Sequence, residues 1–266
     1  MCHFPLVWAT SEEAAGLVGR LRAAPRSLLM LDYDGTLAPF HVDRFQATPY
    51  PGVEGRLAAL SALRRVRLIL VSGRSARELR GLLRRDIEGE IWGSHGREWL
   101  GRDGAYQLFA LNGAQRAALD RFQGEITALG LKHTLEVKPS SIAVHWRSVD
   151  QATGQRIRAS VESTFARLGE VDSLRLLPFD GGVELRSIDR TKGTPVAEIL
   201  GQEPEGVPAA YLGDDFTDED AFAALDKRGF SVLVRDGIRK SCARFWLRPP
   251  EELLGFLDQW IAGAAP

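Results

Sequence analysis

Residues Leu28–Leu37 read Leu-Leu-Met-Leu-Asp-Tyr-Asp-Gly-Thr-Leu, an apolar run that ends in two carboxylates, Asp32 and Asp34. The apolar part is typical of a strand that is buried in a parallel sheet. In open parallel sheets, ligands bind beyond the carboxyl ends of the strands. The stretch therefore predicts an α/β fold whose functional site follows this strand.

The carboxylates of Asp32 and Asp34 predict a cation site, because two close negative charges need a cation or a proton. Oxygen ligands suit hard divalent ions, so Mg²⁺ is the expected cofactor. Asp32 can act as a nucleophile that forms an aspartyl-phosphate, and Asp34 as a general acid and base. Gly35 permits a sharp turn, and Thr36 offers a hydroxyl to a phosphate oxygen. A strand that ends in an Asx-turn would explain the same residues without any chemistry.

Length, charge and cysteine content limit the class of protein. A chain of 266 residues is long enough for a large α/β core with a smaller inserted domain. Its net charge of −1 gives no reason to expect a nucleic acid or an anionic membrane as partner. No basic segment precedes an apolar block at the start, and Cys2 and Cys242 lack metal-ligand spacing. We therefore expect a cytoplasmic protein, a monomer, with two free thiols.

The order of predicted elements changes in the middle of the chain. Strands at 27–31, 66–71 and 90–92 each end in a small polar turn before a helix, as in a doubly wound, Rossmann-like parallel sheet. An amphipathic helix, Thr10–Ala24, is expected before them, capped by Thr10. Locally paired strands and two helices then predict an inserted α+β domain at 105–181. Residues 1–104 and 182–266 form the expected core, to which a strand at Val183–Arg186 is assigned.

Polar groups of four kinds follow the predicted core strands or open a helix. In chain order they are Asp32, Asp34 and Thr36; Ser72; Lys192; and Asp214, Asp215 and Asp218. Each group alone has an ordinary explanation, such as a turn, a solvated lysine or a helix cap. Together they supply what phosphoryl transfer needs: a nucleophile, an acid, groups that bind phosphate oxygens, and metal ligands.

The order and spacing of these motifs resemble the haloacid dehalogenase (HAD) superfamily of phosphatases. The resemblance implies that Asp32 is the nucleophile, that Asp34 is the general acid and base, and that Asp32, the Asp34 main-chain carbonyl and Asp214 bind Mg²⁺. It also implies that the phosphoryl group is bound by Thr36, Ser72, Gly73 and Lys192. Asp215, Asp218 and His95 would contact these site residues rather than the substrate. The insert resembles the C2-type cap of this superfamily.

A narrower resemblance is to trehalose-6-phosphate phosphatases. It rests on these segments: Leu31–Leu37, Ser72-Gly-Arg, Gly93-Ser-His-Gly, His145-Trp-Arg147 and Gly213-Asp-Asp-Phe-Thr-Asp-Glu-Asp220. The resemblance implies a Mg²⁺-dependent phosphatase of a small sugar phosphate, with Lys138, Arg147 and Glu184 on the sugar hydroxyls. Independently, Lys138, His145 and Arg147 alternate along two predicted strands, so they are expected to share one face of a sheet.

Other functions fit part of the same pattern. A phosphatase of sucrose 6-phosphate or mannosyl-3-phosphoglycerate would need the same core and a different sugar site. A receiver-like signalling domain also combines a phosphorylated aspartate, a hydroxyl residue and a lysine on a parallel sheet. The second acid, Asp34, argues against that alternative, because a long-lived phosphoaspartate would not tolerate it. A catalytically silent sugar-phosphate binder would not need the full set of catalytic groups.

Overall fold

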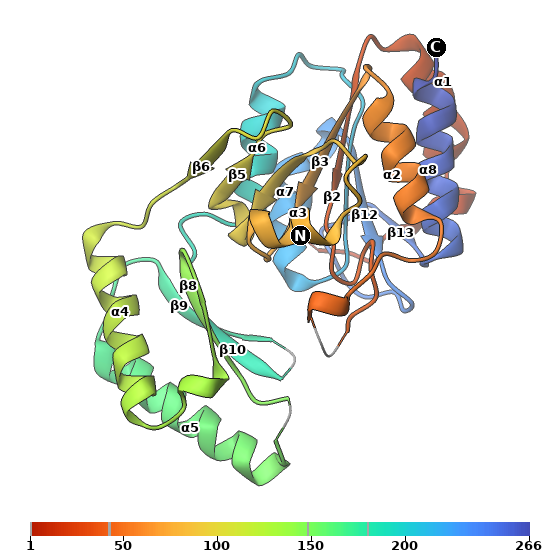
Figure 1. The fold of residues 1–266 in the computed structure, drawn as a ribbon. Helices are drawn as coiled ribbons and strands as arrows, with labels where there is room; N and C mark the ends of the chain where they lie inside the picture. The colour runs from red at the N-terminus through yellow and green to blue at the C-terminus, as the bar shows by residue number, and fades with distance from the viewer. Residues whose placement is uncertain (1, 42–43, 148, 180) are drawn as a thin grey trace. The chain divides into compact units, whose positions relative to one another are not determined.

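The computed structural model describes residues 2–41, 44–147, 149–179 and 181–266. The chain forms two compact units. The first comprises the chain up to Gln107 together with Thr191–Pro266, and the second is Leu108–Arg190 (Figure 1).

The first unit is built on a nine-stranded sheet in the order β1-β13-β12-β11-β2-β3-β4-β5-β6. The pairs from β1 to β4 are parallel, and β5 is antiparallel to β4. The strands are β1 (Leu6–Val7), β13 (Phe245–Leu247), β12 (Phe230–Val234), β11 (Ala209–Gly213), β2 (Ser27–Leu31), β3 (Val66–Val71), β4 (Glu90–Gly93), β5 (Glu98–Leu100) and β6 (Tyr106–Leu108).

Helices cover both faces of this sheet, which explains why its central strands are mainly apolar. Alternate residues of β2, Leu29 and Leu31, join a core cluster with Leu17, Leu57 and Leu253 from three helices. That face is covered by α1 (Glu12–Ala23), α2 (Val53–Ala62), α3 (Ala76–Leu82) and α8 (Glu251–Ala264). On the other face, α6 (Gly193–Gly201) and α7 (Glu219–Leu225) pack together, and the Phe222 ring meets the Tyr211 ring of β11. The predicted doubly wound sheet is confirmed.

The second unit is a four-stranded antiparallel sheet in the order β7-β8-β10-β9, with two helices on one face (Figure 1). Its elements are α4 (Gly113–Ala128), β7 (Leu135–Lys138), β8 (Ser141–His145), α5 (Gln151–Leu168), β9 (Leu174–Phe179) and β10 (Gly182–Ser187). Phe122 and Val161 of the helices pack on Ile142, Val144 and Leu185 of the sheet. The opposite sheet face carries the charged residues of the same strands.

The boundaries of the insert differ from those predicted. Strand β10 was assigned to the core, but it pairs with β8 and β9 in the second sheet. It does so because Val183 and Leu185 complete the apolar face beneath the helices. At the other boundary, β6 lies beside β5 in the first sheet. The insert therefore runs over Leu108–Arg190 rather than 105–181.

Two local features complete the description. The predicted cap of the first helix was wrong by one residue, because the Ser11 hydroxyl, not that of Thr10, accepts the hydrogen bond from the Ala14 N–H. The two ends of the second unit meet, since the Arg190 guanidinium lies 3.8 Å above the centre of the Phe109 ring. Among the described residues, we find no helix with the length and apolar character that crossing a membrane requires.

Candidate active site

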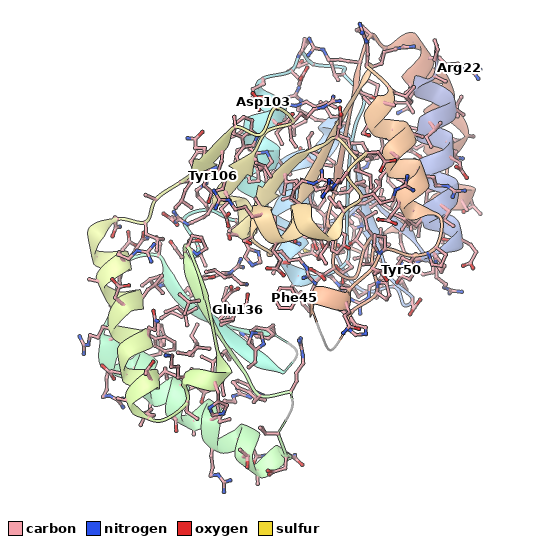
Figure 2. The ribbon with its side chains drawn as sticks, in the orientation of Figure 1. Arg22, Phe45, Tyr50, Asp103, Tyr106 and Glu136 are labelled. Carbon is pink, nitrogen blue, oxygen red and sulfur yellow. The ribbon has the colours of Figure 1, made fainter. Side chains whose placement is uncertain are left out.

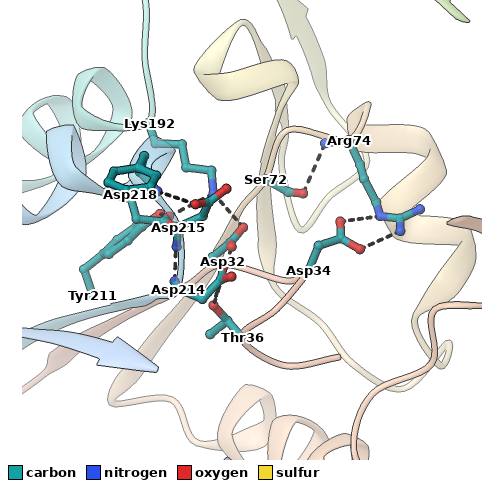
Figure 3. Close-up of polar contacts among 11 residues, drawn as sticks. Asp32, Asp34, Thr36, Ser72, Arg74, Lys192, Tyr211, Asp214, Asp215 and Asp218 are labelled. Carbon is teal, nitrogen blue, oxygen red and sulfur yellow. Dashed lines mark hydrogen bonds and ion pairs between the residues drawn. The ribbon is translucent and has the colours of Figure 1, made fainter. Parts of the chain in front are cut away.

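The candidate site lies at the carboxyl ends of three neighbouring strands, β11, β2 and β3 (Figure 3). Leu31 pairs in register with Leu212 on one side and with Leu70 on the other. The register brings together the residues that follow each strand, among them Asp32, Asp214 and Ser72. Lys192 reaches the same place from the residue before α6.

Asp32 is buried, with 3% of its surface exposed. Its Oδ1 lies 2.9 Å from Lys192 Nζ, and its Oδ2 lies 3.5 Å from the Thr36 hydroxyl oxygen. Burial, followed by the charge of Asp218, raises the pKa of Asp32 to about 7 from an ordinary value of 3.8, despite the neighbouring lysine. The side chain is thus buried, oriented by Lys192 and costly to ionise unless further positive charge is supplied.

Asp218 holds the site together, because both of its carboxylate oxygens accept two hydrogen bonds each. Oδ1 accepts from Lys192 Nζ at 2.8 Å and from the Tyr211 hydroxyl at 2.6 Å. Oδ2 accepts from the backbone N–H groups of Asp214 at 3.2 Å and Asp215 at 3.1 Å. A carboxylate offers about four lone-pair sites, so Asp218 is fully used in positioning its neighbours.

Asp32, Asp214 and Asp218 form a carboxylate cluster, with one oxygen of each within 4.8 Å of the others. Burial and the charge of Asp32 raise the pKa of Asp214 to about 9. Lys192 brings one positive charge to three carboxylates, so the cluster could bind a metal ion. Because the oxygens of Asp218 are taken, Asp32 and Asp214 are the side chains that could hold it.

Gly35 allows the turn after β2 to pass close to Asp214. Its φ is +82°, in the left-handed region, and a Cβ on this residue would lie 2.1 Å from Asp214 Oδ2. The expected sharp turn is therefore present, and the absence of a side chain also leaves room for the Asp214 carboxylate. Any larger residue would push Asp214 out of the carboxylate cluster.

The Asp34 carboxylate, which the sequence predicted to share a site with Asp32, pairs with Arg74 (Figure 3). Arg74 Nε and Nη2 donate to the two Asp34 oxygens at 2.6 Å each, and Nη1 donates to Glu78 at 2.7 Å. The planar guanidinium fork matches a carboxylate in two places, which a single lysine could not do. Arg74 backbone N–H also donates to the Ser72 hydroxyl at 3.1 Å.

Arg74 was not among the predicted site residues. Its position two residues after Ser72, at the end of β3, is the signal that could have identified it. The side chain is buried, with 7% of the residue exposed. A buried arginine requires an anionic partner, and the sequence alone does not show which acid that will be.

His95 packs against Gly73, both of which the sequence predicted near the site. A Cβ on Gly73 would lie 2.7 Å from the His95 ring, so the imidazole occupies the space that a side chain would need. The His95 backbone N–H donates to the Ser72 carbonyl at 3.0 Å. Asp215 accepts a hydrogen bond from the Phe216 N–H at 2.7 Å and caps the short 3-10 helix Phe216–Asp218.

The charged face of the second unit brings several predicted sugar-binding residues together (Glu136 is labelled in Figure 2). Lys138 Nζ lies 2.8 Å from Glu184 Oε1, which also accepts from the Ser141 hydroxyl at 2.7 Å. Glu136 lies 2.8 Å from His145 and 3.5 Å from Lys138.

Arg147 lies beyond the end of β8, with its guanidinium 5.6 Å above the centre of the Phe179 ring of β9. The strand register places Lys138 and His145 on one face, as expected. Arg147 follows the strand, so the alternation along β8 does not place it on that face, and its predicted sugar contact rests on the family resemblance.

The chain is similar to known proteins over most of its length. The family model described as trehalose-phosphatase matches residues 30–245. A trehalose-phosphate phosphatase of Mycobacterium marinum is 32% identical over 250 residues, which cover 87% of this chain and 60% of that protein. The chain spans between 18% and 63% of the length of the first curated relatives that it matches.

Solved structures show the same fold. The C-terminal domain of Candida albicans trehalose-6-phosphate phosphatase superposes with a TM-score of 0.76 at 21% identity, covering 98% of each chain. A haloacid dehalogenase-like hydrolase from Bacillus subtilis superposes with a TM-score of 0.60 at 14% identity, covering 87% of this chain and 99% of the other.

Proposed function

This chain belongs to the trehalose-phosphatase family, and we propose that it hydrolyses trehalose 6-phosphate to trehalose and phosphate with Mg²⁺ as cofactor. The observation that carries the proposal is the buried carboxylate cluster beside Lys192, with Asp32 directly after the central strand β2. A site of this kind suits a phosphomonoester, whose negative oxygens need a cation and whose phosphorus needs a nucleophile.

The proposed reaction has two steps. Asp32 attacks the phosphorus, a bond forms between its carboxylate oxygen and phosphorus, and the bond to the sugar oxygen breaks. Asp34 supplies the proton to that departing oxygen. Asp34 then takes a proton from water, which attacks the aspartyl-phosphate and releases phosphate. Lys192, Thr36 and Ser72 hold the phosphoryl oxygens during both steps.

The donor set fits Mg²⁺, because Asp32 and Asp214 both present carboxylate oxygens. Burial raises the pKa of both carboxyl groups, and a second positive charge beside Lys192 would favour their ionised form. The main-chain carbonyl of Asp34 is the third proposed protein ligand. Bound there, Mg²⁺ would neutralise charge on the phosphoryl oxygens. Arg74 must release the Asp34 carboxylate before that side chain can reach a leaving oxygen.

Magnesium is expected to raise the melting temperature more at pH 9 than at pH 6. The folded pKa values of Asp32, about 7, and Asp214, about 9, lie above the ordinary 3.8, so the folded state binds these protons more tightly. Their contribution to stability is complete below about pH 4 and is lost as pH rises through 7 and 9. Mg²⁺ replaces the lost protons. Thermal melts with EDTA or Mg²⁺ across this range measure the effect, and a shift that is constant with pH would contradict it.

Phosphate release from trehalose 6-phosphate, sucrose 6-phosphate, mannosyl-3-phosphoglycerate and glucose 6-phosphate tests the proposal directly, with Mg²⁺ and with EDTA. We expect strong, Mg²⁺-dependent preference for the trehalose ester. Equal rates across the panel would retain the phosphatase core and reject the sugar assignment. A stable phosphoprotein without turnover, after treatment with acetyl phosphate, would instead support a receiver-like role.

Replacing Glu184 by glutamine is expected to lower kcat/KM for trehalose 6-phosphate roughly 10- to 100-fold, the usual range for losing a hydrogen bond to a charged group. Glu184 positions Lys138 and Ser141 on the charged face of the second unit. Activity on p-nitrophenyl phosphate, which has no sugar, should stay within about twofold of the unmodified enzyme. Glu170→Gln is the matched control, since Glu170 is exposed in the same unit. Equal losses on both substrates would reject a sugar-binding role.

A further inference from the structure

The two cysteines are neighbours in space although 240 positions separate Cys2 from Cys242 in the sequence. His3 and Ser241 exchange both backbone hydrogen bonds, at 3.0 and 2.9 Å, in an isolated antiparallel bridge. This register places Cys2 opposite Cys242 as a pair without backbone hydrogen bonds. In such pairs the Cα atoms lie about 4.5 Å apart and the side chains approach closely.

The two thiols have the geometry that a disulfide needs. Their sulfur atoms lie within 4.8 Å of each other, and both cysteines are free. A Cα separation of about 4.5 Å falls inside the range of about 4.4–6.8 Å seen for disulfides. We propose that Cys2 and Cys242 are a redox-modification site that closes into a disulfide and fastens the first residues of the chain to the segment before β13.

A metal site is the competing use of these residues, because a Glu219 oxygen lies within the same 4.8 Å. The Glu219 carboxylate is already engaged, however. It forms an ion pair with Arg239 and accepts hydrogen bonds from the Ser241 hydroxyl at 2.9 Å and the Cys242 N–H at 2.6 Å. Its charge and its oxygens are thus committed to the protein, which leaves two sulfur atoms and favours disulfide formation.

Thiol–disulfide exchange with a low-molecular-weight disulfide balances the reaction. Cys2 is exposed, so its thiolate attacks one sulfur of the reagent and releases the first reagent thiol. The Cys242 sulfur then attacks Cys2 Sγ in the mixed disulfide and releases the second. Two protein thiols are oxidised, and one reagent disulfide is reduced to two thiols.

The surroundings of Cys242 suit an anionic reagent such as oxidised glutathione. A hollow of about 360 Å³ is lined by Cys242, by the basic residues His3, Lys227 and Arg244, and by one acid, Asp226, so basic groups predominate. Contact with the Cys2 thiol, together with burial, raises the pKa of Cys242 to about 12. Cys242 therefore remains a thiol until Cys2 has reacted, which sets the order of the two exchanges.

The closed disulfide would strengthen a part of the protein that supports the candidate active site. Arg239, three residues before Cys242, pairs with Glu219 at the start of α7 and donates to the Asp214 carbonyl at 3.4 Å. Closing so long a loop restricts the unfolded chain, so the oxidised protein should melt higher by about 5 °C or more.

The test is to treat the full chain with oxidised glutathione and to measure free thiols, intact mass and melting temperature. We expect both thiols to disappear with a loss of two hydrogens, a peptide map that links residues 2 and 242, and a melting shift that dithiothreitol reverses. Cys2→Ser and Cys242→Ser should each lack the shift and retain one reactive thiol or one glutathione adduct.

Three results would overturn the proposal. The first is two separate glutathione adducts in the unsubstituted chain, and the second is a disulfide between two copies of it. The third is tight binding of Zn²⁺, measured by calorimetry, that protects both thiols from oxidation and is lost in Glu219→Gln; this would make the three residues a metal site. Because neither cysteine belongs to the catalytic groups, failure of this test leaves the proposed phosphatase function untouched.

Discussion

Replacing Asp32 by asparagine is expected to lower kcat for trehalose 6-phosphate by about 10⁴-fold or more, because an amide oxygen cannot form the acyl-phosphate bond. The same change should not lower the melting temperature in EDTA. Asp32 is buried with a pKa raised to about 7, so its negative charge costs free energy at pH 8, and asparagine keeps the shape without the charge. Steady-state kinetics and thermal melts at pH 8 measure the two effects.

Asp86→Asn is the matched control for this experiment. Asp86 makes an exposed ion pair with Arg84 at 2.5 Å, and exposed pairs contribute little to stability. Both the kinetics and the melting temperature of the control should match the unmodified chain. Turnover within tenfold of normal in Asp32→Asn would remove the nucleophile assignment, whereas a large fall in melting temperature would show that Asp32 is needed for folding.

Replacing Lys192 by methionine is expected to lower the free energy of unfolding by about 3–5 kcal/mol, because it leaves buried carboxylates without their compensating charge. Lys192 bridges Asp32 at 2.9 Å and Asp218 at 2.8 Å, and 3% of its surface is exposed. Activity should also be lost, since the ammonium would no longer neutralise phosphoryl oxygens. Urea denaturation measures the stability, and phosphate release measures the activity.

A second variant separates charge compensation from simple loss of packing. Adding Asp218→Asn to Lys192→Met removes one of the unpaired negative charges, so the double variant should recover part of the lost stability without recovering activity. Lys132→Met, at an exposed position in the second unit, controls for the change of side chain. A double variant less stable than Lys192→Met would contradict the electrostatic explanation.

The core fold could be predicted because its signals are local. The strands at 27–31 and 66–71 are mainly apolar, apart from Ser27 and Arg67, and end in polar turns, and the structure places both where they were expected. Once these strands are parallel and adjacent, the residues after them must meet at one edge of the sheet. Asp32, Ser72 and Asp214 are such residues, and their meeting follows from the strand order alone.

Features that depend on partner choice could not be predicted in the same way. Strand β10 has an alternating pattern that suits either sheet. Its apolar residues Val183 and Leu185 pack against the helices of the second unit. The Asp34 carboxylate was likewise expected beside a cation shared with Asp32, whereas it pairs with Arg74, an arginine that follows a different strand. The placement of the two cysteines depends on a single bridge between distant segments.

The meeting of Phe109 and Arg190 has a consequence for how such a protein can be rebuilt. A segment whose ends lie in contact can be removed or exchanged as a unit, because the rest of the protein needs only a short linker in its place. The cation–π contact at 3.8 Å closes the second unit at its base, and its own apolar cluster lies between α4, α5 and the four-stranded sheet. Inheritance and laboratory recombination can therefore exchange the second unit while keeping the first, and under the proposed function such an exchange would change the substrate without changing the chemistry.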